Sequence, residues 1–353
     1  MRLPEVNKME VKIKEIIPKN WEYKENNDLI TVWYKNTNKS PTPLTIKKYI
    51  KVDERLGTFL GFWAGDGGKT SFSLTDNNTK LLNVIYRNMK RSIGHIDLKL
   101  RVMVPPNLID IKEDIIRDVK NIFPEIKEIK IDNYKKYRNQ PIYQLMNSKT
   151  MTTKFIKHIH NYFSENTYKK DSFWDGYLKG IIAAEGHMEI RKRWKTLSRI
   201  SIAQENAKIR QNIFESLEAR NIKYSSNKGY INISGKDNYN IILKRGLYNL
   251  HPVKKNQFLL GYNNIKQEQY SDKKAEFNIL NELKTPIRVS EVAKRLNRER
   301  QTIRGHMQLK PNSLIERGLI RKWSNKRSSR GSFYCELWTL TEKGLNHLKE
   351  CEI

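Results

Sequence analysis

Cysteine is nearly absent from this chain, because its 353 residues include only two, Cys335 and Cys351, both near the C-terminus. Neither lies among histidines or cysteines at metal-ligand spacing, so the sequence predicts no disulfide framework and no zinc site. Long apolar runs are absent as well: no stretch approaches the length of a membrane span, and the N-terminus lacks the apolar segment of a secretory signal. The sequence therefore predicts a cytoplasmic protein with no membrane partner.

Acidic residues are scarce relative to basic ones. Asp and Glu number 38 against 67 Lys and Arg, which gives a formal net charge of +29. A surplus of this sign and size points to a polyanionic partner and favours nucleic acid over a membrane surface. Part of the surplus is expected to lie on solvated lysine-rich faces without a partner.

One short sequence motif occurs twice, in residues 57–67 and in residues 176–186. Each copy has small residues at four-residue spacing, followed by an acid and a glycine. The small residues are Gly57, Gly61 and Gly65 in the first copy and Gly176, Gly180 and Ala184 in the second. Small residues at this spacing lie along one side of an α-helix and let two backbones approach closely. Equivalent positions are 119 residues apart throughout, so the copies match in register.

Each repeated helix is expected to end at its acid, Asp66 in the first copy and Glu185 in the second. A carboxylate in the last turn meets the negative end of the helix dipole, and packing the two small faces together brings Asp66 and Glu185 close to each other. Folding alone gives no reason for this repulsion. A divalent cation does, because it turns two repelling acids into an oxygen-ligand site. The following Gly67 and Gly186 are expected to end the helices in the left-handed conformation.

At these residues the chain resembles the LAGLIDADG homing endonucleases, with one motif at residues 59–67 and the other at 178–186. The resemblance implies an α+β fold in which two pseudo-symmetric αββαββα halves meet at the motif helices and form a saddle for double-stranded DNA. It also implies that Asp66 and Glu185, together with the backbone carbonyls of Gly65 and Ala184, bind Mg²⁺ or Mn²⁺.

The same resemblance implies a lysine near the cleaved phosphate in each half. In the second half the candidates are Lys254 and Lys255, of which we select Lys255 as the catalytic lysine. In the first half the candidates are Lys169 and Lys170. Because lysine is abundant in this chain, an exposed side chain without a catalytic role is the alternative at each position.

The pattern along the chain predicts four parts: an N-terminal cap segment at 1–50, a first half at 51–168, a second half at 169–270, and a further domain at 271–353. In the last part, three short amphipathic helices precede two strands that flank a basic loop. This order resembles a winged helix-turn-helix and implies a recognition helix at 298–308 and a wing at 325–330. A three-helix packing domain without a DNA function is the alternative.

Candidate DNA contacts follow from these assignments, because a twisted sheet in the major groove presents alternate side chains to base edges. The expected set from the two halves is Lys69, Ser71, Ser73, Arg191, Arg193, Lys195 and Arg199. The expected set from the C-terminal domain is Arg300, Gln301, Arg304 and His306 in the major groove, with Lys326, Arg327 and Arg330 on the backbone or in the minor groove.

The sequence thus predicts a monomeric, site-specific, metal-dependent endonuclease that cuts double-stranded DNA. Two alternatives stay open. One is a transcription regulator that uses the same scaffold to bind DNA without cutting. The retained acids argue against it, since a binder has no use for paired repelling carboxylates. The other is an RNA-binding splicing maturase, which basicity does not separate from the nuclease.

Overall fold

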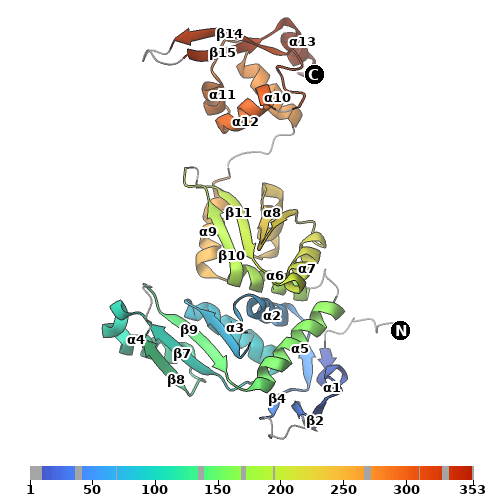
Figure 1. Ribbon diagram of the computed structural model, residues 1–353, viewed down its shortest axis with the longest axis vertical. Helices are drawn as coiled ribbons and strands as arrows, with labels where there is room; N and C mark the ends of the chain where they lie inside the picture. Colours follow the sequence, from blue (N-terminus) through green and yellow to red (C-terminus); the bar gives the residue numbers. More distant parts are fainter. Residues whose placement is uncertain are drawn as a thin grey trace. The chain divides into compact units, whose positions relative to one another are not determined.

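The chain folds into two compact units, residues 1–265 and 266–353, each built around its own hydrophobic core. The computed structural model describes residues 10–35, 42–68, 70–133, 139–167, 172–193, 195–265, 272–309, 311–327 and 334–351. Both units mix helices with small sheets, which confirms the predicted α+β class (Figure 1). No helix of the described residues has the length and apolar content needed to span a bilayer.

The first unit opens with short strands around a small helix. These elements are β1 (Glu10–Lys12), α1 (Ile13–Ile16), β2 (Trp21–Asn26), β3 (Leu29–Tyr34), β4 (Leu44–Lys47) and β5 (Tyr49–Lys51). The strands form an antiparallel β2-β3-β4 sheet and a β1-β5 pair. Ile30, Val32 and Ile46 on one face of the three-stranded sheet are buried in the core of the unit.

A four-stranded sheet with order β6-β9-β7-β8 follows. Its elements are α2 (Glu54–Asp66), β6 (Phe72–Asp76), α3 (Thr79–Ile93), β7 (Lys99–Val104), η1 (Pro106–Ile111), α4 (Lys112–Ile122), β8 (Ile129–Asn133), β9 (Ile142–Asn147) and α5 (Thr150–Asn166). Asp53 caps α2, where its side chain accepts hydrogen bonds from the backbone N–H groups of Arg55 and Leu56.

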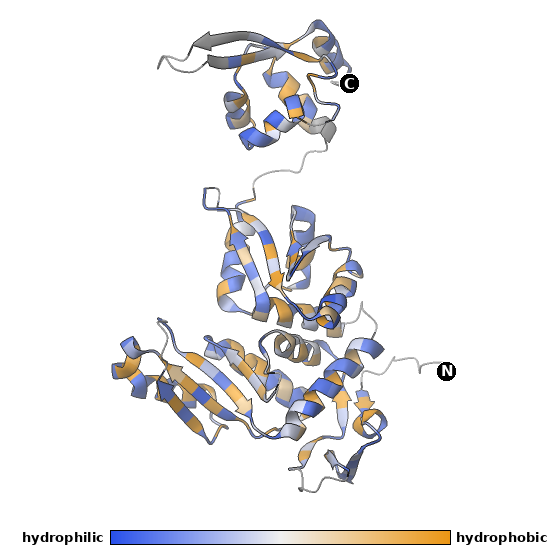
Figure 2. Cartoon of the chain, viewed as in Figure 1, coloured by the Kyte–Doolittle hydropathy of each residue, from blue (hydrophilic) through white to orange (hydrophobic). Residues whose placement is uncertain are grey.

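A second four-stranded sheet, fully antiparallel, has the order β10-β11-β13-β12. Its elements are α6 (Ser172–Glu185), β10 (Gly186–Ile190), β11 (Leu197–Ala203), α7 (Ala207–Glu218), β12 (Tyr224–Asn227), β13 (Tyr230–Ile233), α8 (Lys236–Arg245) and α9 (Pro252–Asn263). Figure 2 shows apolar and polar segments alternating along the strands of both four-stranded sheets. Each sheet therefore has one buried and one outward face.

The region from α2 to α5 and the region from α6 to α9 differ in the order of their elements. The second region has the expected order of helix, two strands, helix, two strands and helix. In the first region, α3 follows β6 directly, and β7 pairs with β8 in parallel. A parallel pair needs a crossover, which α4 provides. The expectation of two αββαββα halves is therefore met in element order by the second region and not by the first.

The second unit contains α10 (Asp272–Glu282), α11 (Val289–Arg295), α12 (Arg300–Arg304), η2 (Gly305–Leu309), β14 (Ile320–Arg327), β15 (Tyr334–Leu340) and α13 (Glu342–Cys351). Leu280, Val292, Ile303 and Met307 meet Trp338 of β15 in its core. The predicted single helix over 298–308 is instead the short α12 continued by η2, which is a π-helical turn.

Candidate active site

The helices α2 and α6 pack against each other through the small residues of the repeated pattern. A β-carbon at Gly61 would lie 2.1 Å from the carbonyl oxygen of Tyr177, and one at Gly180 would lie 2.3 Å from that of Thr58. Gly57 and Gly176, one turn earlier, leave equally little space, with distances of 1.8 and 2.0 Å to opposing carbonyl oxygens. No side chain fits at these positions, so the two backbones are in direct contact, as the four-residue spacing predicts.

The close approach continues to the last turn of both helices. A β-carbon at Gly65 would lie 2.6 Å from the β-carbon of Ala184 and 2.9 Å from Cγ of Glu185. Asp66 and Glu185 end α2 and α6, and both are partly exposed. The two acids therefore stand on facing helix ends at an accessible edge of the seam.

Gly67 and Gly186, which follow the acids, do not adopt the left-handed conformation expected of them. Gly67 has φ −80° and ψ 142°, and Gly186 begins β10. Glycine is needed at both positions for space, because a β-carbon would lie 2.1 Å from the Trp63 carbonyl oxygen at Gly67 and 2.4 Å from that of Ile182 at Gly186. The preceding helical turn, and not a positive φ, excludes a side chain.

Lys254 of α9 reaches the end of α6. Its ammonium group donates hydrogen bonds to the backbone carbonyl oxygens of Ala183 at 2.5 Å, Ala184 at 2.8 Å and Ile182 at 3.3 Å. Burial lowers the pKa of Lys254, while the negative charges of Asp66, Asp76 and Glu185 act in the opposite direction. A cation at this end of α6 also complements the helix dipole.

Lys255, selected from the sequence as the catalytic lysine, is exposed, so its neighbour Lys254 is the lysine that the fold places beside the acids. The register of α9 explains this. Adjacent residues of a helix point about 100° apart, so Lys254 and Lys255 leave α9 in different directions and only Lys254 reaches the carbonyl groups of α6. Lys169 and Lys170 lie outside the described residues. The Ala184 carbonyl, expected to bind metal, accepts a hydrogen bond from Lys254 and keeps a second lone pair.

Asp76 and His251, which sequence reasoning missed, lie next to this lysine. Asp76 ends β6 and accepts a hydrogen bond from the Asn78 backbone at 2.6 Å, and its Oδ1 atom is 4.0 Å from Nε2 of His251. Nδ1 of His251 accepts a hydrogen bond from the Val253 N–H at 3.2 Å, which places the proton of the neutral ring on Nε2, facing Asp76. An acid directly after an alternating strand and a histidine before a helix-starting proline were the signals available.

Burial lowers the pKa of His251 and raises that of Asp76. Since the folded chain holds the pKa of His251 below its ordinary value of 6.5, the unfolded chain takes up this proton first as the pH falls. The contribution of His251 to the unfolding free energy should therefore decline as the pH drops below 6.5 toward the folded-state pKa. Denaturant titrations on both sides of that value test this: the decline should be smaller in His251→Gln than in the wild type. His187→Gln, at an exposed histidine of β10, is the matched control, and equal declines in all three proteins would contradict the expectation.

The candidate DNA contacts of the β10–β11 hairpin are placed differently from the prediction. Arg191, Arg193 and Lys195 follow the end of β10 and lie in the turn, where the Lys195 N–H donates to the Arg191 carbonyl at 2.8 Å. They do not alternate on one strand face as expected, because the strand stops at Ile190. Arg199 lies on the outward face of β11 and forms an ion pair with Glu189 at 2.5 Å.

Three further candidate contacts lie between α2 and the middle of β6. Of these, Lys69 lies outside the described residues. Ser71 lies just before β6. Ser73, on β6, is buried and does not face outward as expected, because the first three residues of this strand are all buried. The Gly68 N–H donates to the Ser73 carbonyl at 3.1 Å, so this segment is a tight hairpin.

Two rows of polar residues on the outward faces of the four-stranded sheets were not predicted from the sequence. Neighbouring strands align Thr75, Gln144, Arg101 and Lys130 across the first sheet and His187, Ser201, Asn232 and Ser225 across the second. These rows depend on strand pairing, which periodicity does not reveal.

In the second unit, Arg300, Gln301 and Arg304 are exposed on α12, opposite the buried Ile303, and His306 is half-buried on η2. Lys326 and Arg327 end β14. Arg330 lies outside the described residues. The exposed side of α12 is therefore basic and polar, as the sequence predicts.

The described residues contain no cluster of three or more His, Cys, Asp and Glu side chains able to hold a metal ion. Asp66 and Glu185 offer two carboxylates. This number suits Mg²⁺, which keeps several waters and binds through one or two carboxylates plus substrate phosphates. The donor set thus fits a cation shared with a phosphate-bearing substrate.

Comparison with known proteins yields few matches. No family model and no curated protein matches the chain. Among solved structures, the crystal structure of full-length DUF199/WhiA from Thermatoga maritima matches with a TM-score of 0.36 and 9% sequence identity, covering 72% of this chain and 88% of that one. This finding corrects the family assignment made from the sequence. The matching structure is described as DUF199/WhiA, and no family model supports the LAGLIDADG endonuclease assignment.

Proposed function

We propose that the chain is a divalent-metal-dependent endonuclease that cuts double-stranded DNA at a specific site. The observation that carries the proposal is the seam of α2 and α6, which holds Asp66 and Glu185 on facing helix ends. Two acids placed together at the negative ends of two helices repel each other and the helix dipoles, and a divalent cation relieves this repulsion. The net charge of +29 supports a DNA partner, and the presence of both acids in one chain supports action as a monomer.

In this proposal Asp66 and Glu185 hold Mg²⁺ or Mn²⁺, which when bound supplies Lewis-acid stabilisation of the attacked phosphate and lowers the pKa of a coordinated water. Lys254 adds a positive charge beside the same edge. Its hydrogen bonds to the α6 carbonyl groups fix its position, so little of its freedom is lost when a phosphate binds.

The outward faces of the two four-stranded sheets, with their polar rows, form the duplex-binding saddle in this proposal. The second unit acts as a winged helix-turn-helix, with α12 as the recognition helix and the β14–β15 hairpin as the wing. The basic and polar exposed side of α12 supports this role.

A DNA-binding regulator that does not cut is the second candidate, and one observation favours it. The ammonium of Lys254 lies beside the acids and compensates part of their charge, so the paired carboxylates can persist without a cation. The regulator would bind the same duplexes and leave them intact.

A cleavage assay separates the two candidates. The full chain is incubated with duplex DNA of its host genome in Mg²⁺ or in EDTA, and the DNA ends are sequenced. A nuclease produces recurrent ends at one sequence with Mg²⁺ and none with EDTA. A regulator enriches a sequence in a binding experiment while the recurrent ends are missing in both conditions.

The neighbouring lysines of α9 provide a matched pair of variants. We expect Lys254→Gln to lower the cutting rate by about a hundredfold, the typical cost of removing one stabilising donor from an active site, and Lys255→Gln to leave it near the wild-type value. Melting temperatures of both variants control for folding. Equal effects of the two substitutions would contradict the placement of Lys254.

Because the second unit has its own core, a fragment of residues 266–353 is expected to bind duplex DNA alone. Its affinity should fall steeply with salt, by a logarithmic slope of roughly −0.9 for each phosphate contacted. Arg300→Gln with Arg304→Gln should weaken binding, and deleting the unit should leave cutting detectable at high protein concentration. A folded fragment that fails to shift duplex DNA at low salt would remove the winged-helix role.

A further inference from the structure

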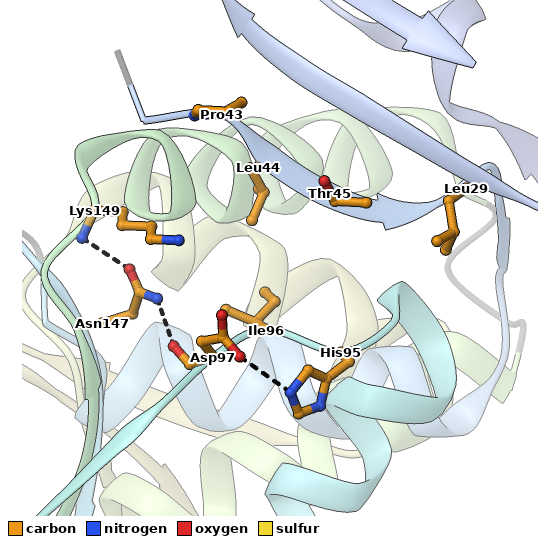
Figure 3. Close-up of a pocket in the computed structure, with 9 residues that line it drawn as sticks. All are labelled: Leu29, Pro43, Leu44, Thr45, His95, Ile96, Asp97, Asn147 and Lys149. Carbon is orange, nitrogen blue, oxygen red and sulfur yellow. Dashed lines mark hydrogen bonds and ion pairs between the residues drawn. The ribbon is translucent and has the colours of Figure 1, made fainter. Parts of the chain in front are cut away.

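Away from the seam, the first unit contains adjoining hollows between the β3–β4 edge, the C-terminal end of α3 and the loop before α5. One hollow of about 320 Å³ is lined by Leu29, Pro43 and Leu44 on one side and by His95, Asp97 and Lys149 on the other (Figure 3). A second hollow of about 560 Å³ shares Leu29 and His95 with the first and carries Arg87 and Arg91 on its wall. We refer to the two adjoining hollows as the cavity; its lining has one apolar and one charged side.

The charged side has an excess of cations. Two carboxylates stand against five lysine and arginine side chains in the lining: Glu125 forms an ion pair with Lys90 at 2.5 Å, and Asp97 contacts the imidazole of His95 at 3.3 Å. Within the part of the chain that the structure describes, no ion pair involves Arg87, Arg91 or Lys149. Three unpaired positive charges therefore face or border the two hollows.

Lys149 is the most informative of them, because it is half-buried and precedes the first turn of the 17-residue helix α5. A cation at the positive end of a helix dipole is unfavourable. The backbone here is firmly held: Oδ1 of Asn147 accepts the Lys149 N–H at 2.8 Å, and Nδ2 of Asn147 donates to the Asp97 carbonyl at 2.6 Å. The side chain of Lys149 extends into the hollow below Leu44 (Figure 3). An anion in the hollow would offset the cost of this placement.

The apolar side indicates which anion fits. Leu29 is 45% exposed although it lies in a concave site, and Leu44 and Pro43 continue the same wall. A base can pack on such a surface while its phosphate meets the cations opposite. Single-strand binding sites combine a cationic groove with a surface on which bases pack in the same way, although they use aromatic side chains where this cavity has leucine and proline. The smaller hollow suits a single nucleotide and excludes a duplex. α3 packs into the core under the buried face of the first sheet, so the cavity lies away from the outward polar rows.

We propose that this cavity binds a single nucleic-acid strand, with phosphates on Lys149, Arg87 and Arg91 and a base against Leu29 and Pro43. The strand would be held separately from a duplex on the sheets, so one molecule would engage both at once. This second site is independent of the proposed nuclease function and uses none of its residues.

The test measures binding of short fluorescent single strands, one of RNA and one of DNA, to the full chain in EDTA with saturating unlabelled duplex DNA. Lys149→Glu and Arg87→Glu are compared with Lys244→Glu, which makes the same charge change at an exposed residue of α8. We expect the Kd for the preferred strand to rise about tenfold or more in the first two variants and much less in the third. The logarithmic salt slope should fall by roughly 0.7 for each lost phosphate contact.

Equal weakening in all three variants, or none in any, would overturn the proposal, and so would displacement of the strand by millimolar inorganic phosphate alone. If Lys149→Glu lowers the melting temperature, Lys149→Met replaces it. A photoreactive strand then gives an independent readout: cross-links to residues 87–97 or 147–149 support the site, and cross-links confined to other peptides contradict it. The RNA and DNA arms show which strand is the ligand.

Discussion

Replacing Asp66 by Asn or Glu185 by Gln is expected to abolish double-strand cutting while leaving duplex DNA binding nearly intact. Each substitution keeps the size of the side chain and removes the charge that holds a divalent cation at the seam. The loss should be at least a hundredfold for each variant, on the order of other losses of a stabilising group at a reacting phosphate or carbonyl. Cutting rates in Mg²⁺ and duplex affinity in EDTA, measured on the same preparations, test both halves of the expectation.

Glu113→Gln, at an exposed acid of α4, is the matched control and should cut at the wild-type rate. If either seam variant also cuts at the wild-type rate, the assignment of the two acids is wrong. If both lose DNA affinity together with cutting, the acids shape the binding surface and are not the cation ligands.

Replacing Gly61 or Gly180 by Leu is expected to lower the free energy of unfolding by about 3 kcal/mol or more, because the new side chain would enter space occupied by an opposing backbone. The β-carbon alone would lie 2.1 Å from a carbonyl oxygen at Gly61 and 2.3 Å from one at Gly180. Urea denaturation measures the loss. The helix propensity gained by removing a glycine, roughly 1 kcal/mol, is too small to offset it.

Gly229→Ala is the control that separates the cost of steric contact from the cost of backbone strain. Gly229 has φ +85° and no atom within 4 Å of its absent β-carbon, so this variant should lose only the roughly 1 kcal/mol of a left-handed residue. If neither seam variant changes the melting temperature, α2 and α6 do not meet through these glycines.

The seam could be predicted from the sequence because its signal is local. Glycines four residues apart define one face of a helix whatever the helix packs against, and the second copy supplies the partner. A cap such as Asp53 is equally local, since its side chain accepts hydrogen bonds from the N–H groups two and three residues ahead, within one turn.

Other features depended on residues far apart in the chain and were missed. The parallel pairing of β7 with β8 and the polar rows across both sheets depend on register between strands, which a single strand does not encode. The side chains of Lys254 and Lys255 point in different directions from α9. Only that of Lys254 points toward the end of α6, and the sequence of α9 alone does not reveal where α6 ends. The glycines after the acids were explained by φ, whereas close approach of the preceding turn requires them.

The most direct test of the central claim is anomalous diffraction from crystals of the full chain bound to duplex DNA in Mn²⁺. We expect a manganese peak between the carboxylates of Asp66 and Glu185, with metal–oxygen distances slightly above 2 Å, as for a small divalent cation of this kind. The peak should disappear in the Asp66→Asn protein. Crystals in which Mn²⁺ binds elsewhere and the ammonium of Lys254 fills the space between the two acids would contradict the claim.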